Sequence, residues 1–374
     1  MNPPVTARLL LALLPLLAGT PLPLPAASAW RQLASLPDAV GFAGPFAGVS
    51  GGALLVAGGA NFPGAKPWEG GQKIWHDDVF VLEEPDGDWR RAGRLPAPLG
   101  YGVAVTHRSG LICVGGSDAQ RHHTNAFLLH WKRGRLDIEP LPPLPEPAAN
   151  LSGALLGETL IVAGGTAAPD STRALQSAWS LDLTERAHSW RALPPIPGPG
   201  RMLATAGAHD GAFYLIGGAA LRAGADGKPV RDWLREAWRF TPGGGWQRLA
   251  DLPRPVVAAP SPAPIAHGRL LILGGDDGAQ AGHPPAQHRG FPRDTLAYEA
   301  KSGRWLAAGE LPFSLVTTVA VPWHREILIP GGESRPGIRS TAVWAGRPAD
   351  FPQPIRTPVP PARALAPGRE NPLP

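Results

Sequence analysis

A short segment near the end of the chain contains side chains that could do chemistry. It runs Gly332-Glu333-Ser334-Arg335-Pro336-Gly337-Ile338-Arg339, which places one carboxylate and two guanidinium groups in one compact loop. A carboxylate can accept a proton, and a guanidinium can hold an anionic group through two parallel hydrogen bonds. The segment therefore predicts a site for acid–base chemistry beside an anion.

Other polar residues suited to such a site lie mostly in long segments that follow a pair of adjacent glycines, namely 60–77, 219–235 and 276–293. The candidates for substrate binding are Arg335, Asn61, Glu69, Lys73, His76, Arg293 and, in a connection between repeats, Arg201. A single charged loop residue is more often only solvated. A shared location on one face of the fold is what would support a site.

The elements that position these residues follow from an internal repeat. Glycine doublets end short apolar runs at Gly58, Gly115, Gly164, Gly217, Gly274 and Gly331, spaced 57, 49, 53, 57 and 57 residues apart. Each interval shows four strand-like runs, as four-stranded propeller blades require. The sequence predicts an all-β fold, a six-bladed kelch-type β-propeller over residues 30–346.

A second marker predicts how the ring closes. An aromatic residue stands six positions before a Leu-Pro or Ile-Pro pair at Trp30, Trp89, Trp190, Trp246 and Trp305, and Ile138 fills the missing place. Trp30 precedes the first doublet, whereas the last doublet has no such strand after it. We therefore expect an N-terminal outer strand to complete the C-terminal blade, which leaves no open edge.

Loop lengths predict which face carries the site. Turns between the first and second strands of each blade are short, and His107, His209, His267 and His324 recur in them as turn residues. The long segments all lie on the opposite face, which also carries the connections between blades. Binding sites are expected where long loops sit on a rigid scaffold.

The ends of the chain predict an exported protein. Arg8 precedes an apolar run and Ala27-Ser28-Ala29 offers a small-residue cleavage site, so residues 1–29 are expected to be a signal peptide. Prolines interrupt the run too early for a membrane span. We expect a periplasmic or secreted protein with no membrane span after cleavage. Residues 347–374 are rich in proline and are interpreted as an extended tail.

Composition excludes several other functions. One cysteine, Cys113, rules out an internal disulfide framework and all multi-cysteine metal sites. His122-His123 and His76-Asp77-Asp78 lack a recognised ligand spacing, so no metal site and no cofactor are predicted. The basic residues form no cluster, which argues against nucleic acid and allows a small anionic ligand. The oligomeric state is left open.

The 332–339 segment resembles the Gly-Glu-x-basic-Pro-Gly-aliphatic-Arg segment of the N-acetylneuraminate epimerases, or sialic acid mutarotases, which are exported kelch propellers. In the best-known members this loop precedes a Gly-Phe-Ala-Gly segment in mid-chain. Here Gly41-Phe42-Ala43-Gly44 opens the chain, so the sequence resembles a cyclically permuted branch of that family. Segments 58–71 and 75–78 are similar to this branch.

The resemblance implies a function. It identifies Glu333 and Arg339 as catalytic residues that interconvert the anomers of N-acetylneuraminate or a related keto-sugar acid, by acid–base opening and reclosure of the ring. It implies a small carboxylated sugar as the partner and an isomerase without a cofactor. The alternative is a non-catalytic kelch propeller that binds a carbohydrate or a protein, because a fold alone does not fix function.

Overall fold

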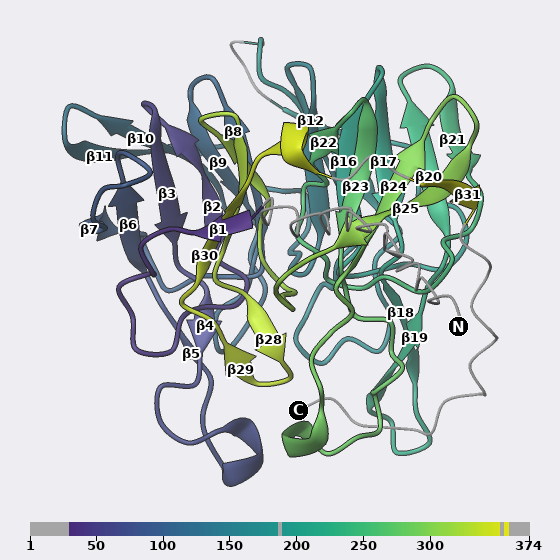
Figure 1. The fold of residues 1–374 in the computed structure, drawn as a ribbon, viewed down its shortest axis with the longest axis horizontal. Coiled ribbons are helices and arrows are strands. Elements are labelled where there is room, and N and C mark those ends of the chain that lie inside the picture. Colours follow the sequence, from purple (N-terminus) through teal and green to yellow (C-terminus); the bar gives the residue numbers. More distant parts are fainter. Residues whose placement is uncertain (1–29, 186–188, 352–354, 359–374) are drawn as a thin grey trace, which may run out of the picture.

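The computed structural model describes residues 30–185, 189–351 and 355–358, and the predicted signal peptide lies outside them. The fold is a six-bladed β-propeller, as predicted, with each blade a separate antiparallel sheet (Figure 1). Six glycine doublets thus correspond to six blades. Each doublet directly follows the second strand of its blade.

The blades contain the following strands. Blade one has β2 (Phe46–Ser50), β3 (Ala53–Ala57), β6 (Asp78–Leu82) and β7 (Arg90–Arg94); blade two has β8 (Val103–His107), β9 (Gly110–Val114), β10 (Ala126–Lys132) and β11 (Arg135–Leu141). Blade three has β12 (Ser152–Leu156), β13 (Thr159–Ala163), β14 (Ala178–Asp182) and β15 (Trp190–Ala192); blade four has β16 (Thr205–His209), β17 (Ala212–Ile216), β20 (Ala237–Thr241) and β21 (Gly245–Arg248). Blade five has β22 (Ile265–Ala266), β23 (Arg269–Leu273), β24 (Asp294–Glu299) and β25 (Arg304–Glu310); blade six has β26 (Val321–Trp323), β27 (Glu326–Pro330), β30 (Val343–Gly346) and β1 (Trp30–Gln32).

The N-terminal strand closes the ring in the predicted way. Strand β1 pairs antiparallel with β30, with Trp30 opposite Gly346 and Gln32 opposite Trp344. The sheet order β1-β30-β27-β26 therefore joins the two ends of the described fold in one blade. Trp30 is buried against Phe313 and Phe351, so the closing strand also contributes to the core.

The marker tryptophans fasten neighbouring blades together. In four of them the indole N–H donates a hydrogen bond to the carbonyl that lies four residues after the marker of the preceding blade. The pairs are Trp89 to Ala34, Trp190 to Pro142, Trp246 to Pro194 and Trp305 to Ala250, at 2.8–2.9 Å. Ile138 has no side-chain N–H to donate and packs against the core of blade one instead, where the Trp131 indole donates to Glu83 at 3.0 Å.

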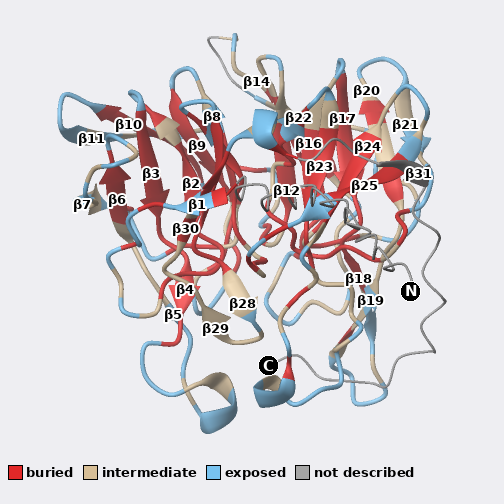
Figure 2. Cartoon of the chain, viewed as in Figure 1, coloured by how far each residue is buried: buried red, intermediate tan, exposed pale blue. Residues whose placement is uncertain are grey.

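Extra structure accumulates on one face. Three two-stranded hairpins lie at the lower edge of Figure 1: β4 (Ala60–Asn61) with β5 (Ile74–Trp75), β18 (Ala219–Ala223) with β19 (Pro229–Trp233), and β28 (Glu333–Arg335) with β29 (Ile338–Arg339). The short 3-10 helices η1 (Pro67–Glu69) and η2 (Pro285–Gln287) lie there too. Figure 2 shows that blade strands are buried while the tips of these loops are exposed. The prediction that long loops share one face is confirmed.

The region predicted to be a tail contains two elements. The 3-10 helix η3 (Pro348–Asp350) follows β30, and β31 (Ile355–Pro358) pairs with β25 as a fifth strand of blade five. The sequence did not show this because its prolines disfavour central strands, and β31 lies at a sheet edge, where proline is tolerated.

Candidate functional site

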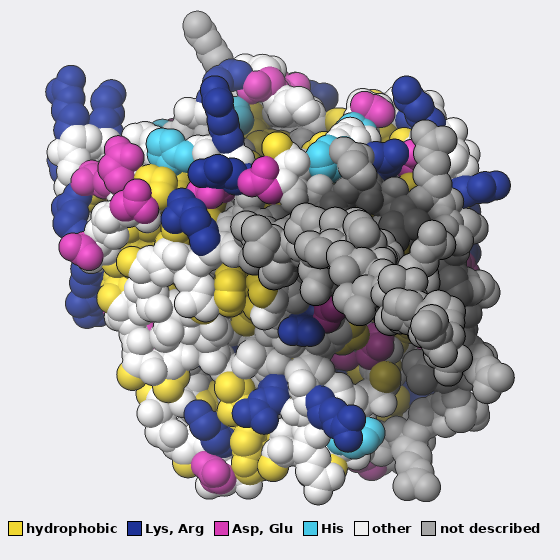
Figure 3. All heavy atoms as spheres, viewed as in Figure 1, with side chains coloured by type: hydrophobic (Ala, Val, Ile, Leu, Met, Phe, Trp, Pro, Cys, Tyr) yellow, Lys and Arg dark blue, Asp and Glu magenta, His cyan; other side chains and the backbone are white. Residues whose placement is uncertain are grey.

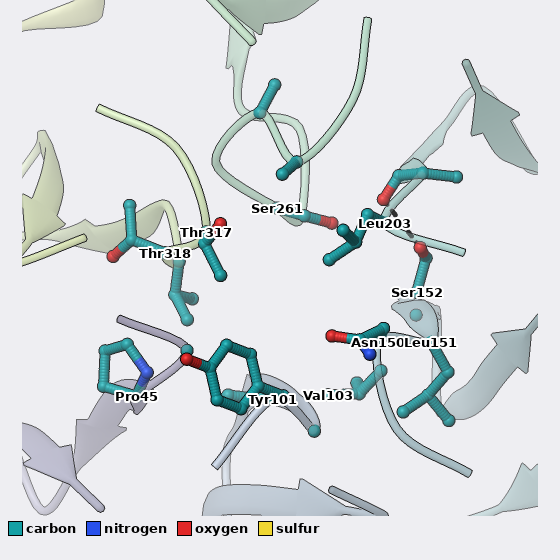
Figure 4. A pocket seen from close by; sticks show the side chains of 18 residues that line it. Pro45, Tyr101, Val103, Asn150, Leu151, Ser152, Leu203, Ser261, Thr317 and Thr318 are labelled. Carbon is teal, nitrogen blue, oxygen red and sulfur yellow. Dashed lines mark hydrogen bonds between the residues drawn. The ribbon is translucent and has the colours of Figure 1, made fainter. Parts of the chain in front are cut away.

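The axis of the propeller is lined by a closed ring of backbone hydrogen bonds. One residue from each blade donates its N–H to the carbonyl of the equivalent residue in the neighbouring blade, at 2.7–2.8 Å, and all six have positive φ. The six are Gly44, Tyr101, Asn150, Leu203, Ala258 and Thr317. Figure 4 looks into the cavity that they surround, whose volume is about 70 Å³. Ligand pockets usually measure about 300 Å³ or more, so this cavity is too small to enclose a drug-sized ligand.

A second ring surrounds the mouth of the axis on the face of the long loops. The residue after each glycine doublet forms a β-bridge with the residue just before a ring residue of the same blade. These six positions are Ala60, Ser117, Thr166, Ala219, Asp276 and Glu333. Two of them carry carboxylates, and the two belong to adjacent blades. Glu333 therefore stands at the rim of the axis, with Asp276 as its neighbour.

Four of the six rim residues are also approached by a side chain from the blade before them. Trp75 donates to Ser117 Oγ at 3.3 Å, and His122 Nδ1 lies 2.8 Å from the carbonyl oxygen of Thr166. Trp233 donates to Asp276 Oδ2 at 3.0 Å, and Arg339 Nε donates to the carbonyl of Ala60 at 3.3 Å. All four stand opposite their own blade's rim residue across a hairpin or bridge. Arg339 thus occupies a position that aromatic rings fill in other blades.

Glu333 and Arg339 form a buried ion pair. The two residues face each other across β28 and β29, and Arg339 Nη1 lies 2.7 Å from Glu333 Oε1. The Arg339 side chain is 4% exposed and that of Glu333 is 18% exposed. Burial disfavours the charged guanidinium, but Glu333 and Tyr101 outweigh it and raise the pKa of Arg339. The predicted pair is therefore brought together, with its charges facing the mouth.

The two oxygens of Glu333 differ in their surroundings. Oε1 accepts the N–H of Gly337 at 2.5 Å, in addition to the contact with Arg339. No hydrogen bond or ion pair joins Oε2 to any residue that the structure describes. One oxygen fixes the carboxylate, and the other remains able to accept a proton.

Tyr101 and Lys73 complete this side of the mouth. The Tyr101 phenol interacts with Arg339, and Lys73 Nζ lies 5.0 Å from the centre of the Tyr101 ring and 5.1 Å from that of Trp75. The Arg339 guanidinium lies 5.1 Å above the ring of Phe62. Two cations are thus held against aromatic faces, an arrangement stabilised by cation–π attraction. Figure 3 shows further Lys and Arg side chains along the lower edge.

Asn61 and His76 lie beneath the mouth as supports. Asn61 is fully buried, with its Nδ2 donating to Asp38 Oδ1 at 3.2 Å and its Oδ1 lying 2.8 Å from His76 Nε2. Burial lowers the pKa of His76, with Asp38 and Asp77 opposing that shift. Both residues hold the β4–β5 hairpin in place, and Asn61 has no exposed surface for a ligand.

Glu69 and Arg335 lie farther out. Glu69 accepts the N–H of Lys66 at 2.9 Å and caps the exposed helix η1. Arg335 is exposed on β28, and its charge lowers the pKa of the buried His288, although desolvation lowers it more. Gly337 lies so close to Pro67 and Trp68 that an added Cβ would be 2.8–3.0 Å from them. The loop with η1 therefore packs on the β28–β29 turn.

Two predicted binding residues belong to the scaffold. Arg201 is buried between blades three and four, where it donates to Glu236 Oε2 at 2.7 Å and to the Gly217 carbonyl at 3.2 Å. Arg254 repeats this arrangement one blade later, with Asp294 and the Gly274 carbonyl. Arg293 pairs with Glu310 at 2.5 Å on the exposed end of blade five. The carboxylate partners of Arg201 and Arg293 favour structural roles for both, and binding of substrate by these two residues stays a prediction.

Sequence reasoning missed Tyr101, Phe62 and Arg231. Tyr101 lies outside the long segments that the sequence singled out, and only the position of Gly44, its counterpart before the first strand of blade one, could have revealed its place in the ring. Segment 219–235 was predicted to reach the site. The β18–β19 hairpin, which places Arg231 and Trp233 there, was not predicted.

Other sites receive less support. A hollow of about 680 Å³ opens on the opposite face among Pro264, Ile265 and Trp323. Its one carboxylate, Glu326, is already bound to Arg31 at 2.9 Å. Across the ranges that the structure covers, no group of three or more His, Cys, Asp or Glu side chains is arranged to hold a metal ion. Nor does any helix in those ranges have the length and apolar character to cross a membrane.

Comparisons with known proteins point in one direction. A family model of N-acetylneuraminate epimerase matches residues 25–138. The N-acetylneuraminate epimerase of Yersinia pestis (strain Pestoides F) is 43% identical over 111 residues, which cover 26% of this chain and 27% of that protein. The one from Brucella suis is 38% identical over 129 residues, covering 30% of this chain and 33% of that protein. The matches thus span about a third or less of these relatives.

The fold likeness extends much farther than the sequence likeness. A solved structure described as the structure of YjhT superimposes with a TM-score of 0.62, covering 83% of this chain and 96% of that one at 16% identity. This likeness supports the propeller fold alone. The resemblance to N-acetylneuraminate epimerases is shown over residues 25–138, which include Lys73 and Tyr101 but not Glu333 or Arg339.

Proposed function

We propose that this protein is a mutarotase that interconverts the anomers of N-acetylneuraminate or a related keto-sugar acid. The single observation that carries the proposal is the Glu333–Arg339 pair at the mouth of the axis, with one free carboxylate oxygen. The family match over residues 25–138 supports the substrate class, because it covers both Lys73 and Tyr101.

Mutarotation needs a base and an acid, and the mouth offers both. Glu333 Oε2 takes the proton from the anomeric hydroxyl, a carbonyl forms at that carbon, and the bond from the carbon to the ring oxygen breaks. The Tyr101 hydroxyl gives its proton to the ring oxygen. After rotation about the carbon–carbon bond, the same groups act in reverse and close the ring on the other face. No electrons are transferred, so the reaction balances without a cofactor.

In this proposal, Arg339 positions the base. Its guanidinium contacts Glu333, the Ala60 carbonyl, the Phe62 ring and Tyr101, so most of its binding capacity is already used. The resemblance implied that this arginine is catalytic, and its contacts favour the narrower role of orienting both the base and the acid.

We also propose that the chain is a cyclic permutation of the family's propeller and that it is exported. A cyclic permutation of the family's kelch-type propeller accounts for a family match confined to residues 25–138 alongside a fold likeness over 83% of the chain. We further propose that residues 1–29 direct export to the periplasm or the medium. N-terminal sequencing of the exported protein should then find a start near Trp30, the first residue of β1.

The test is anomer exchange measured by NMR. One pure anomer of N-acetylneuraminate is dissolved with the mature protein, and the approach to equilibrium is compared with buffer and with heat-inactivated protein. Positioned acid–base groups should accelerate exchange by about 10²- to 10⁴-fold. Binding of the sugar without acceleration would instead support a non-catalytic carbohydrate-binding propeller.

A further inference from the structure

Arg231 is a partly buried cation without a partner. Its Nε is inaccessible to solvent and has no hydrogen-bond partner, and no ion pair or hydrogen bond joins its side chain to any residue that the structure describes. Arg201 and Arg339 differ from it, because each forms an ion pair with a carboxylate, Glu236 and Glu333 respectively. A buried polar group without a partner is costly, which makes an absent anionic ligand the natural explanation.

The hairpin geometry directs Arg231 toward the mouth. Arg231 and Trp233 are two residues apart on β19, so their side chains project from the same face of the strand. The Trp233 indole donates to Asp276 Oδ2 at 3.0 Å, and an added Cβ on Gly278 would lie 2.7 Å from that indole. The face that carries Arg231 therefore turns toward the rim of blade five, next to Glu333.

The charges around Arg231 agree with this placement. Desolvation lowers the pKa of its guanidinium, and the negative charges of Asp276 and Glu333 oppose that shift. These two carboxylates are near enough to influence Arg231, although neither forms an ion pair with it. The cation thus stands at the mouth, close to both carboxylates of the rim.

We propose that Arg231 binds the carboxylate of the sugar acid and so sets the preference for acidic substrates; this inference rests on the proposed function. A guanidinium matches a carboxylate with two parallel hydrogen bonds. Asp276 and Glu333 repel an anion from their side of the rim, so the carboxylate is directed to Arg231. The adjacent anomeric carbon, which bears that carboxylate in a keto-sugar acid, then faces Oε2 of Glu333.

The experiment compares Arg231→Gln with the wild type in calorimetric binding of N-acetylneuraminate and of its methyl ester. The wild type should prefer the acid, and Arg231→Gln should lose affinity for the acid by about 10- to 100-fold while binding the ester unchanged. Arg222→Gln is the matched control, since Arg222 lies on the same hairpin in an exposed pair with Asp232. It should bind like the wild type.

A second readout separates binding from folding. Because Arg231→Gln removes an unpaired, partly buried charge, its melting temperature without ligand should not fall, while the stabilisation by N-acetylneuraminate should disappear. A normally melting Arg231→Gln that keeps the preference for the acid overturns the inference, as does a wild type that binds acid and ester equally. A wild type that prefers the acid without accelerating exchange refutes the mutarotase proposal and leaves the role of Arg231 intact.

Discussion

Replacing Glu333 by Gln is the sharpest test of the proposed base. The amide oxygen can still accept the Gly337 N–H, so the turn keeps its shape. It cannot accept a proton at neutral pH, so acceleration of anomer exchange should fall by about 10²- to 10⁴-fold. The exchange rate of Glu333→Gln per folded molecule should then be that of a site that still contains Arg339 but has no base.

The structure also predicts a loss of stability. Glu333→Gln leaves the Arg339 cation, 4% exposed, without its carboxylate. Fully buried pairs lose about 3–5 kcal/mol on such a change and exposed pairs about 1 kcal/mol or less, so a pair at the rim should lose about 2 kcal/mol. With an unfolding entropy of about 2.1 cal/mol/K per residue, the melting temperature should fall by about 3 °C.

A matched control separates the two effects. Glu236→Gln breaks a pair of the same length, 2.7 Å, with Arg201 fully buried and Glu236 24% exposed, in the scaffold between blades. It should destabilise the protein by a similar amount and leave the exchange rate per folded molecule unchanged. If Glu333→Gln exchanges anomers at the wild-type rate, or if Glu236→Gln loses as much activity, Glu333 is not the base.

Three further predictions follow from the described contacts. Tyr101→Phe should slow exchange at least tenfold with substrate affinity retained, while Tyr298→Phe, a buried tyrosine in blade five, should not; equal rates would remove Tyr101 as the acid. Burial lowers the pKa of His122 below its unfolded value of 6.5, so the unfolded chain binds more protons and stability should fall as pH drops through 6.5 toward 5.5. Melting curves should show this slope, and His122→Asn should reduce it. Trp190→Phe removes the hydrogen bond to the Pro142 carbonyl and should lower unfolding free energy by about 1–2 kcal/mol in urea titrations, without changing the exchange rate.

The fold could be predicted because its markers are required in every blade. The glycines of each doublet adopt positive φ, and the tryptophans bond to the preceding blade, so both recur in the sequence. Trp30 precedes the first doublet, so its strand cannot belong to the first blade. The last blade lacks an outer strand, and the closing strand could therefore be predicted. These features depend on local geometry, which a linear sequence records.

The site could be predicted only in part, because its members come from different blades. Glu333 and Arg339 were found together since one hairpin carries both. The burial of Arg201 between blades could not be predicted, because a buried arginine and a ligand-binding arginine look alike in sequence. Arg231 was missed because its importance lies in the partner it lacks, and that absence exists only in three dimensions.

The repeat itself explains how a site can arise on this scaffold. The residues that contact the next blade's rim are Trp75, His122, Trp233 and Arg339. In the first three, a ring nitrogen makes the contact that holds neighbouring blades together. Only blade six uses a guanidinium there, and only blades five and six have a carboxylate on the rim. Because Arg339 still donates to the Ala60 carbonyl, the structural bond survives while its remaining N–H groups serve Glu333. Catalytic chemistry can therefore be added at a structural position without loss of the contact between blades.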